Sequence, residues 1–235
     1  GWHIECSAMS LELLAGHVDI HVGGIDLRFP HHENERAQSK ALINQEAVDL
    51  WVHGEHLLFE GKKMSKSSGN VVLLKDVIER GFDPLAIRLC FLENKYRSQM
   101  DLTWKSIEAA NETIKRWRLK MAQWSTDSSI TIDSEIEAAF NTDLDTSKAI
   151  IRLREIEKDG SENKAAVFRY ADQVLGLDLE RAEEKKLLTP AMQDLIDQRS
   201  VARLEKRWAD SDKLRDELEK LGITIKDTAD GQVWN

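Results

Sequence analysis

The segment Lys63–Ser67 carries residue types that bind a polyphosphate. Its two lysines, Lys63 and Lys66, flank a small hydroxyl residue, and Ser68–Asn70 follows directly. Lysine ammonium groups can neutralise the charge that develops on a departing pyrophosphate, and hydroxyls and free backbone N–H groups supply further donors. Taken alone, these residues fit an exposed basic loop equally well. We call residues 63–70 the lysine loop.

Cys6, His31 and Glu35 form a candidate set of metal ligands. His31 and Glu35 are spaced i, i+4, so both side chains project from one face if the segment is helical. Thiolate, imidazole and carboxylate are acceptable zinc ligands, and a thiolate favours Zn²⁺ over Mg²⁺ or Ca²⁺. The spacing does not choose between His31 and His32, and surface histidines beside a free cysteine are the commoner origin of such a pattern. A closed structural site also needs a fourth ligand.

Gly23, Gly24 and Asp26 are a weaker candidate for a nucleotide site. Glycines after a strand let the backbone approach a nucleotide closely, and an aspartate there can bind ribose hydroxyls. A simple turn is the commoner structure for this pattern.

The elements that must position these residues have mixed α/β character up to about Asp76. Hydrophobic periodicity and turn residues predict helices over Ser7–Gly16 and from Pro30 through Ala37, strands over Asp19–Gly24 and Leu50–Phe59, and a turn at Glu60-Gly61. From Val77 onward the pattern is helical. The predicted helices begin at Asp83 and cover Thr103–Trp124, Glu135–Glu157 with a break near Asn141–Asp143, Lys164–Leu177 and Gln193–Leu221, before a strand-like tail at Ile223–Asp227.

Composition narrows the class of protein. The 235 residues are 41% hydrophobic and 32% charged, and the net charge of -9 argues against non-specific coating of nucleic acid. No apolar run reaches the length of a membrane span, and two cysteines are too few for a disulfide scaffold, so we expect a cytoplasmic protein. The opening residues Gly1–Cys6 read as the middle of a folded unit, which predicts a fragment of a longer protein.

The order of the motifs is more specific than any one of them. Gly1–Met9, Phe29–Glu35, Trp51–His53 and the lysine loop follow one another in a sequence that resembles cysteinyl-tRNA synthetase, a class I aminoacyl-tRNA synthetase. The resemblance covers nearly the whole chain. It continues through Tyr96–Gln99, Phe140–Asp143, Trp208–Asp216, Leu221–Ile223, Asp227-Thr228 and Gly231–Trp234.

The resemblance implies a role for each candidate residue. Cys6, His31 and Glu35 correspond to three of the family's four zinc ligands, Trp2 and His21 to the cysteine pocket, Gly24 and Asp26 to the adenosine site, and Lys63 and Lys66 to the groups that handle pyrophosphate. Zinc would take the thiol of the substrate cysteine, and the cysteine carboxylate would attack the α-phosphorus of ATP, which enters with magnesium. The cysteinyl group would then pass to tRNA(Cys).

The resemblance also implies the fold, the domains and which of the family's motifs are not in this sequence. We expect an α/β part followed by an all-α part: the C-terminal half of a Rossmann-type catalytic domain over residues 1–76, a helical stem-contact and bundle region over 77–178, and an anticodon-binding region over 179–235. The family's fourth zinc ligand and its His-x-Gly-His motif would precede Gly1. We therefore expect weak zinc binding, no cysteine activation by the chain alone, an exposed sheet face, and self-association or a complementing N-terminal chain.

Two other functions fit parts of the sequence: a ligase that joins cysteine to an amino-sugar in mycothiol synthesis, and a truncated paralogue that binds tRNA without catalysis. The region from Trp208 to Trp234 favours tRNA over an amino-sugar, with Trp234 as a candidate stacking surface. Basic residues in the last helices could meet tRNA phosphates, but interleaved acids favour a salt-bridged face. The basic residues are Arg199, Arg203, Lys206, Arg207, Lys213 and Arg215.

Overall fold

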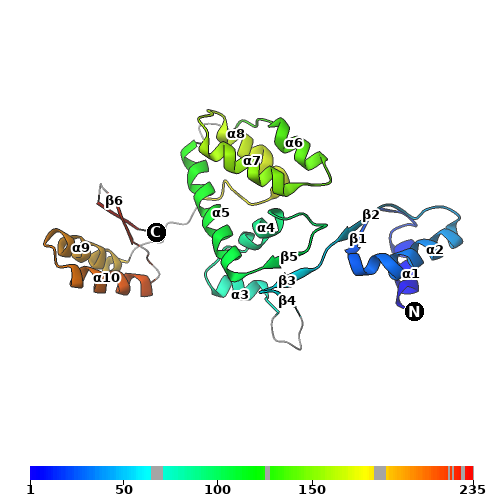
Figure 1. Cartoon of the computed structure of the whole chain (residues 1–235), viewed down its shortest axis with the longest axis horizontal. Coiled ribbons are helices and arrows are strands. Elements are labelled where there is room, and N and C mark those ends of the chain that lie inside the picture. Colours follow the sequence, from blue (N-terminus) through cyan, green and yellow to red (C-terminus); the bar gives the residue numbers. More distant parts are fainter. Residues whose placement is uncertain are drawn as a thin grey trace. The chain divides into compact units, whose positions relative to one another are not determined.

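The computed structural model describes residues 1–64, 71–124, 128–182, 189–221, 223, 225–228 and 231–234. The chain divides into two compact units, Gly1–Ala182 and Glu183–Asn235 (Figure 1). Among the described helices, none is long and apolar enough to cross a membrane.

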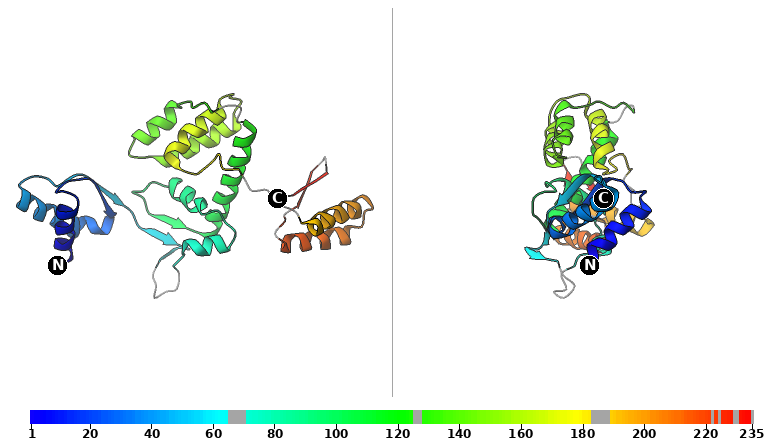
Figure 2. Two further views of the ribbon diagram at one scale, coloured as in Figure 1. Left: turned by 180° about the vertical axis from the view of Figure 1, so that it is seen from behind. Right: turned by 90° about the vertical axis from the view of Figure 1, so that its right-hand side faces the viewer.

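A two-stranded parallel sheet organises the first part of unit 1 (Figure 2). Strand β1 (Val18–Gly24) pairs with β2 (Val48–Gly54), and helix α1 (Trp2–Leu13) precedes them. The crossover that a parallel pair requires consists of a 3₁₀ turn, Ile25–Leu27, a wide π-helical turn, Arg28–His32, and helix α2, Glu33–Ile43. The face of the sheet that carries Ile20, Val22 and Leu50 is open, because each of these side chains is more than half exposed. The expected exposed sheet face is thus confirmed.

Three expected boundaries in this part are wrong. The first helix begins at Trp2, well before Ser7. The second, expected from Pro30, becomes a regular α-helix only at Glu33, because the wide turn Arg28–His32, in which Phe29 is extended, comes first. The single strand expected over Leu50–Phe59 is two strands in different sheets, interrupted at residues 55 and 56.

The second sheet of unit 1 carries the start of the lysine loop. Strand β3 (Leu57–Phe59) pairs antiparallel with β4 (Lys62–Lys63) and parallel with β5 (Met100–Leu102). The turn predicted at Glu60-Gly61 is confirmed. Both residues have positive φ, 51° and 72°, as a tight hairpin turn requires, and glycine adopts such a conformation without strain.

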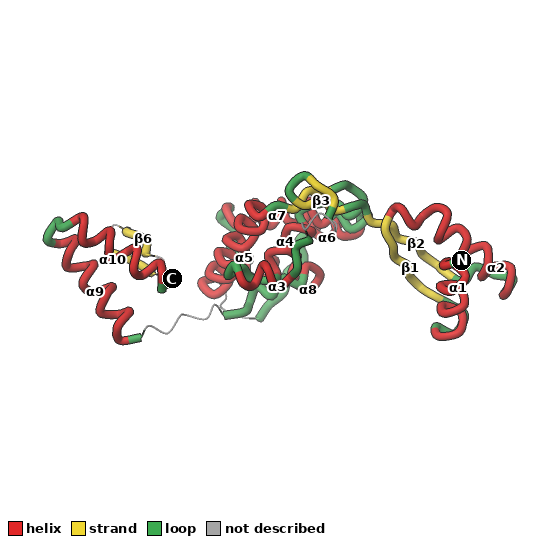
Figure 3. Tube along the Cα trace, turned by 90° about the horizontal axis from the view of Figure 1, so that it is seen from below, coloured by secondary structure: helices red, strands yellow, loops and turns green. Residues whose placement is uncertain are grey.

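Helices build the main core of unit 1 (Figure 3). They are α3 (Leu74–Glu79), α4 (Leu85–Leu92), α5 (Trp104–Trp124), α6 (Ser134–Asn141), α7 (Thr146–Lys158) and α8 (Lys164–Leu175). Along α5, Ile107, Ile114 and Trp117 recur on one face and are fully buried. The predicted helix over 103–124 and the break near 141–143 are confirmed, and Gly176 ends α8 in the left-handed conformation.

A buried carboxylate ties α5 to α7. Glu157 accepts hydrogen bonds from Arg116 Nε at 2.8 Å and from Trp117 Nε1 at 3.0 Å, and Lys120 Nζ lies 3.0 Å away. Burial by itself would raise the pKa of Glu157, but these three donors outweigh it and lower the pKa to about 2. The carboxylate is therefore ionised and fully paired inside the helical core.

Unit 2 consists of helices α9 (Pro190–Leu204) and α10 (Trp208–Lys220) and a hairpin of β6 (Ile225–Thr228) and β7 (Gly231–Trp234). Arg199 is only 1% exposed, and its guanidinium contacts Asp227 at 3.0 Å and Gln232 at 2.7 Å. Arg199 therefore cannot meet a tRNA phosphate as the sequence suggested, because it joins α9 to the hairpin. The salt-bridged alternative is confirmed for Arg207, which pairs with Glu205 and Asp210.

The paired state of Glu157 gives a pH-dependent stability. Glu157→Gln keeps the side-chain size but removes the charge, and it should lower the free energy of unfolding by about 2 kcal/mol, since hydrogen bonds to charged groups contribute about 1.5–3 kcal/mol. The folded-state pKa lies at about 2, below the ordinary value of 4.5. The stabilisation is therefore full above pH 4.5 and is lost as the pH falls toward 2.

Urea unfolding followed by tryptophan fluorescence, repeated across this pH window, measures both effects. Glu155→Gln, on the same helix but exposed, is the matched control and should change the free energy of unfolding by less than about 0.5 kcal/mol. Equal losses at the two positions would contradict a special role for Glu157.

Candidate functional site

The structure brings Cys6, His31 and Glu35 together beside the two-stranded sheet. Their ligand atoms all lie within 4.8 Å of one another, and His31 and Glu35 are buried. Cys6 lies on α1, His31 in the wide turn and Glu35 in the first turn of α2. The packing of α1 against α2 therefore assembles residues that are far apart in the sequence.

The polar atoms of this cluster are not satisfied by the protein alone. Nε2 of His31 lies 2.6 Å from Oε1 of Glu35 without forming a hydrogen bond. Within the described residues, Nδ1 of His31 and Oε1 of Glu35 are both buried and have no hydrogen-bond partner. Burying such atoms unpaired is costly, so they fit a cation that the protein binds at this point.

The thiol of Cys6 completes a donor set that suits zinc. Burial, together with the charge of Glu35, raises the pKa of Cys6 despite a lowering hydrogen bond with Trp2. A divalent cation beside the thiol reverses this shift, because it favours the thiolate. Sulfur, imidazole nitrogen and carboxylate oxygen together fit Zn²⁺ better than Mg²⁺ or Ca²⁺.

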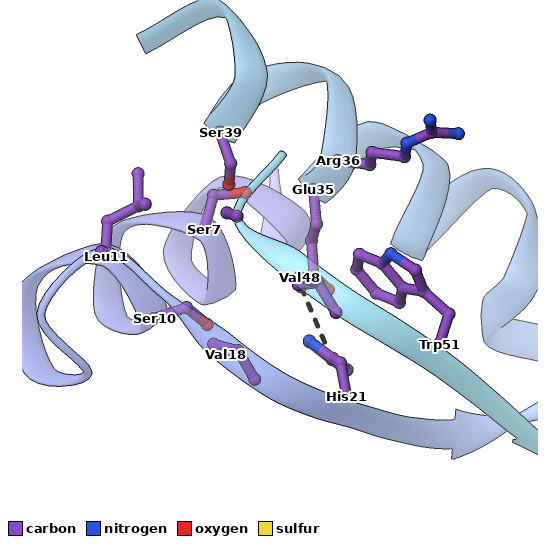
Figure 4. A pocket seen from close by; sticks show the side chains of 12 residues that line it. Ser7, Ser10, Leu11, Val18, His21, Glu35, Arg36, Ser39, Val48 and Trp51 are labelled. Atoms are coloured by element: carbon purple, nitrogen blue, oxygen red, sulfur yellow. Dashed lines mark ion pairs between the residues drawn. The ribbon is translucent and has the colours of Figure 1, made fainter. Parts of the chain in front are cut away.

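Further aromatic and imidazole rings lie near the cluster, and Figure 4 shows two of them, His21 and Trp51, beside Glu35. His21 points toward Glu35, with Nε2 3.7 Å from Oε2, and it stacks on Trp51 with a centroid separation of 4.5 Å. His32 Nδ1 lies 2.9 Å from His53 Nε2. Burial, and then the neighbouring histidines, lower the pKa of His32 to about 4, so His32 is neutral at physiological pH.

His31 and His32, between which the spacing did not choose, both lie near Glu35. His21, His32 and Glu35 form a second group whose ligand atoms lie within 4.8 Å of one another. The two groups share Glu35, whose Oε1 contacts His31 and whose Oε2 faces His21. Only the group with His31 contains a thiol, which favours it as the zinc set.

The two glycines at the end of β1 lie close to His32 and Asp26. A Cβ atom at Gly23 would lie 2.5 Å from Cε1 of His32, and one at Gly24 would lie 2.5 Å from Oδ1 of Asp26. A side chain at Gly23 would therefore displace the ring of His32. The role of Gly24 and Asp26 in binding adenosine stays a prediction.

Of the remaining predicted residues, Trp2 lies beside the cluster and Lys63 lies in the second sheet. The ring of Trp2, though 60% exposed, lies 4.0 Å from the ring of His31 between centroids. Lys63 belongs to β4, in the second sheet, and its backbone pairs with Leu58. Lys66 lies outside the described residues.

Sequence reasoning did not assign Trp51 and His53 to the site. Their alternation in Trp51-Val52-His53 places both on one face of a strand, which was the available signal. The register of β1 with β2 decides their partners, because it sets His21 opposite Trp51 and Gly23 opposite His53. That register is not readable from the sequence.

Two family models match the chain. Residues 1–112 match the class I (C) catalytic domain of tRNA synthetases, and residues 186–234 match the cysteinyl-tRNA ligase anticodon binding domain. Among solved structures, the LeuRS of Agrobacterium radiobacter in a complex with tRNA and LeuAMS is similar over 68% of this chain and 26% of that one, with a TM-score of 0.53 and 19% identity. That likeness shows the fold alone.

Curated relatives extend the match over the whole chain. A cysteine--tRNA ligase of Leptospira interrogans is 36% identical and one of Brachyspira hyodysenteriae 34% identical, each over 100% of this chain. One of Chlamydia felis is 37% identical over 98% of it. The chain spans 54–56% of the length of these relatives. It belongs to the cysteinyl-tRNA synthetase family, with the catalytic-domain match at its beginning and the anticodon-domain match at its end.

Proposed function

We propose that the chain contributes to the activity of a cysteine--tRNA ligase, which activates cysteine with ATP and transfers it to tRNA(Cys). The observation that carries this proposal is the grouping of Cys6 with His31 and Glu35, which are buried and have unsatisfied polar atoms, in a chain that matches both family models. A thiol-containing metal set is the chemistry that a cysteine-selective site needs.

Cys6, His31 and Glu35 would hold the zinc ion. Bound zinc supplies a soft Lewis acid that takes a thiol more readily than a hydroxyl, which separates cysteine from serine. Trp2 and His21 flank the group and would orient the substrate, His21 from its stack on Trp51. No protein nucleophile is needed, because the substrate carboxylate itself attacks ATP.

The nucleotide would lie beyond the end of β1. Asp26 would bind the ribose hydroxyls of ATP, and Gly24 would leave room for its adenosine. Lys63 and Lys66 would neutralise the charge that develops on pyrophosphate as the bond to the α-phosphorus breaks. Magnesium would accompany ATP as part of the substrate.

Unit 2 would bind tRNA. Residues 186–234 match an anticodon-binding model, which favours tRNA over the amino-sugar of the alternative ligase. Several basic side chains of this unit are engaged in ion pairs, Arg207 with Glu205 and Asp210 and Arg215 with Asp212. Contact with RNA would therefore exchange these surface pairs for phosphates, at a small cost in stability.

The sheet of β1 and β2 would be part of a Rossmann-type sheet. Its parallel pairing and its open apolar face support this assignment, because parallel strands are normally covered on both faces. The division into domains at residues 76 and 178 stays a prediction. The three donors would leave one position of the ion open for the thiol of cysteine. That the chain alone does not activate cysteine stays a prediction.

The zinc assignment predicts a specific effect of Cys6. Cys6→Ser replaces the soft ligand by a hydroxyl and should weaken zinc binding by more than about 100-fold, since changes outside a ligand set already cost 10–100-fold. Competition with a chromogenic chelator after dialysis measures the affinity. Cys90→Ala, which removes the buried cysteine of the helical core, should leave the zinc affinity unchanged. Equal loss in the two variants would contradict the assignment.

The substrate assignment is tested by two measurements on the zinc-loaded chain. Isothermal titration should show cysteine bound at least about 100-fold more tightly than serine, because a site built around a specific ligand rejects an analogue that lacks it. Cysteine-dependent exchange of pyrophosphate into ATP should be absent. Equal binding of the two amino acids would refute the substrate, whereas robust exchange would show that the chain alone is competent.

A further inference from the structure

Trp104, the first residue of α5, contacts the segment that precedes residues 65–70 and lines one hollow with the segment that follows them. On the entry side, the ring of Phe59 meets its indole edge-to-face, with centroids 5.6 Å apart. On the exit side, Val71 and Val72 line one hollow together with Trp104. The chain therefore leaves for the lysine loop and returns from it beside the same indole ring.

Hydrogen bonds donated by backbone N–H groups hold the entry hairpin at the same place. The N–H of Trp104 donates to Oε1 of Glu60 at 2.9 Å, and the N–H of Glu60 donates to the carbonyl of Leu102 at 3.0 Å. The N–H of Gly61 donates to the carboxylate of Asp101 at 2.9 Å. These bonds hold the turn that precedes Lys63, in a hairpin whose strand β4 has only two residues.

Arg80 holds the indole from another direction. Its guanidinium carbon lies 3.7 Å from the centroid of the Trp104 ring, where the ring quadrupole attracts a cation. Arg80 follows directly after α3, and α3 begins at Leu74, two residues after Val72. At its start, the N–H of Leu73 donates to Asp76 Oδ2 at 2.8 Å. The exit segment is thus fixed at α3, and the end of α3 is fixed to Trp104.

We propose that Trp104 is a positioning residue for Lys63. It would set the place of the hairpin that carries Lys63 and of the segment to which the lysine loop returns, without touching the substrate. The inference rests on the proposed function, in which Lys63 stabilises pyrophosphate. A lysine is a point charge on a flexible stem, so its effect on a phosphate depends on where its backbone is held.

Three variants of the full chain test the local part of this proposal. Trp104→Ala should speed amide hydrogen exchange in the peptide covering residues 57–63 by about tenfold, as local opening becomes easier. Trp104→Phe keeps an aromatic ring and should give an intermediate rate. Trp124→Ala removes the tryptophan at the other end of α5, which packs on Phe168, and should leave exchange in this peptide unchanged.

The affinity for Mg-ATP, measured by titration with the same proteins, tests the functional part. Trp104→Ala should raise the dissociation constant by about tenfold, with Trp104→Phe restoring most of the affinity and zinc content unchanged in both. If the unaltered chain binds Mg-ATP but Trp104→Ala changes neither exchange nor affinity, or Trp124→Ala changes both equally, the positioning role is refuted alone. If the unaltered chain does not bind Mg-ATP, the proposed function fails and the role in it fails too.

Discussion

Glu35 is buried among groups that carry no permanent positive charge, and this constraint organises the candidate site. Its carboxylate lies 2.6 Å from the imidazole of His31 and within reach of the thiol of Cys6. Three separate elements must meet for this to happen: α1, the wide turn and the first turn of α2. Gly23 belongs to the same arrangement, because its lack of a side chain leaves room for the neighbouring ring of His32.

A comparison of two buried carboxylates shows why Glu35 indicates a site and Glu157 does not. Glu157 lies in the helical core, where an arginine, a lysine and an indole N–H saturate it. Glu35 is equally buried, yet one of its oxygens has no hydrogen-bond partner within the described residues. Burying a carboxylate oxygen that has no hydrogen-bond partner is expensive unless something else compensates the charge. The first arrangement stabilises the fold, whereas the second is suited to a bound cation.

The sequence predicted chemistry better than it predicted geometry. The residue types of Cys6, His31 and Glu35 and the spacing of the last two identified residues that the fold does assemble. Helices with regular apolar spacing, such as residues 104–124, were also predictable, because periodicity reports a buried face directly. The interruption of the strand after Gly54 and the wide turn before α2 were not, because both depend on tertiary contacts. The partners of His32 depend on strand register, and the burial of Arg199 depends on the hairpin it clamps.

X-ray absorption spectroscopy at the zinc edge of the reconstituted chain tests the central claim most directly, because it counts the ligand atoms by type. The account predicts one sulfur near 2.3 Å, the usual zinc–thiolate distance, with the remaining ligands nitrogen or oxygen near 2.0–2.1 Å. Added cysteine should bring a second sulfur into the shell, and added serine should not. A shell of nitrogen and oxygen alone, unchanged by cysteine, would contradict the assignment of Cys6, His31 and Glu35 as a cysteine-selective metal site.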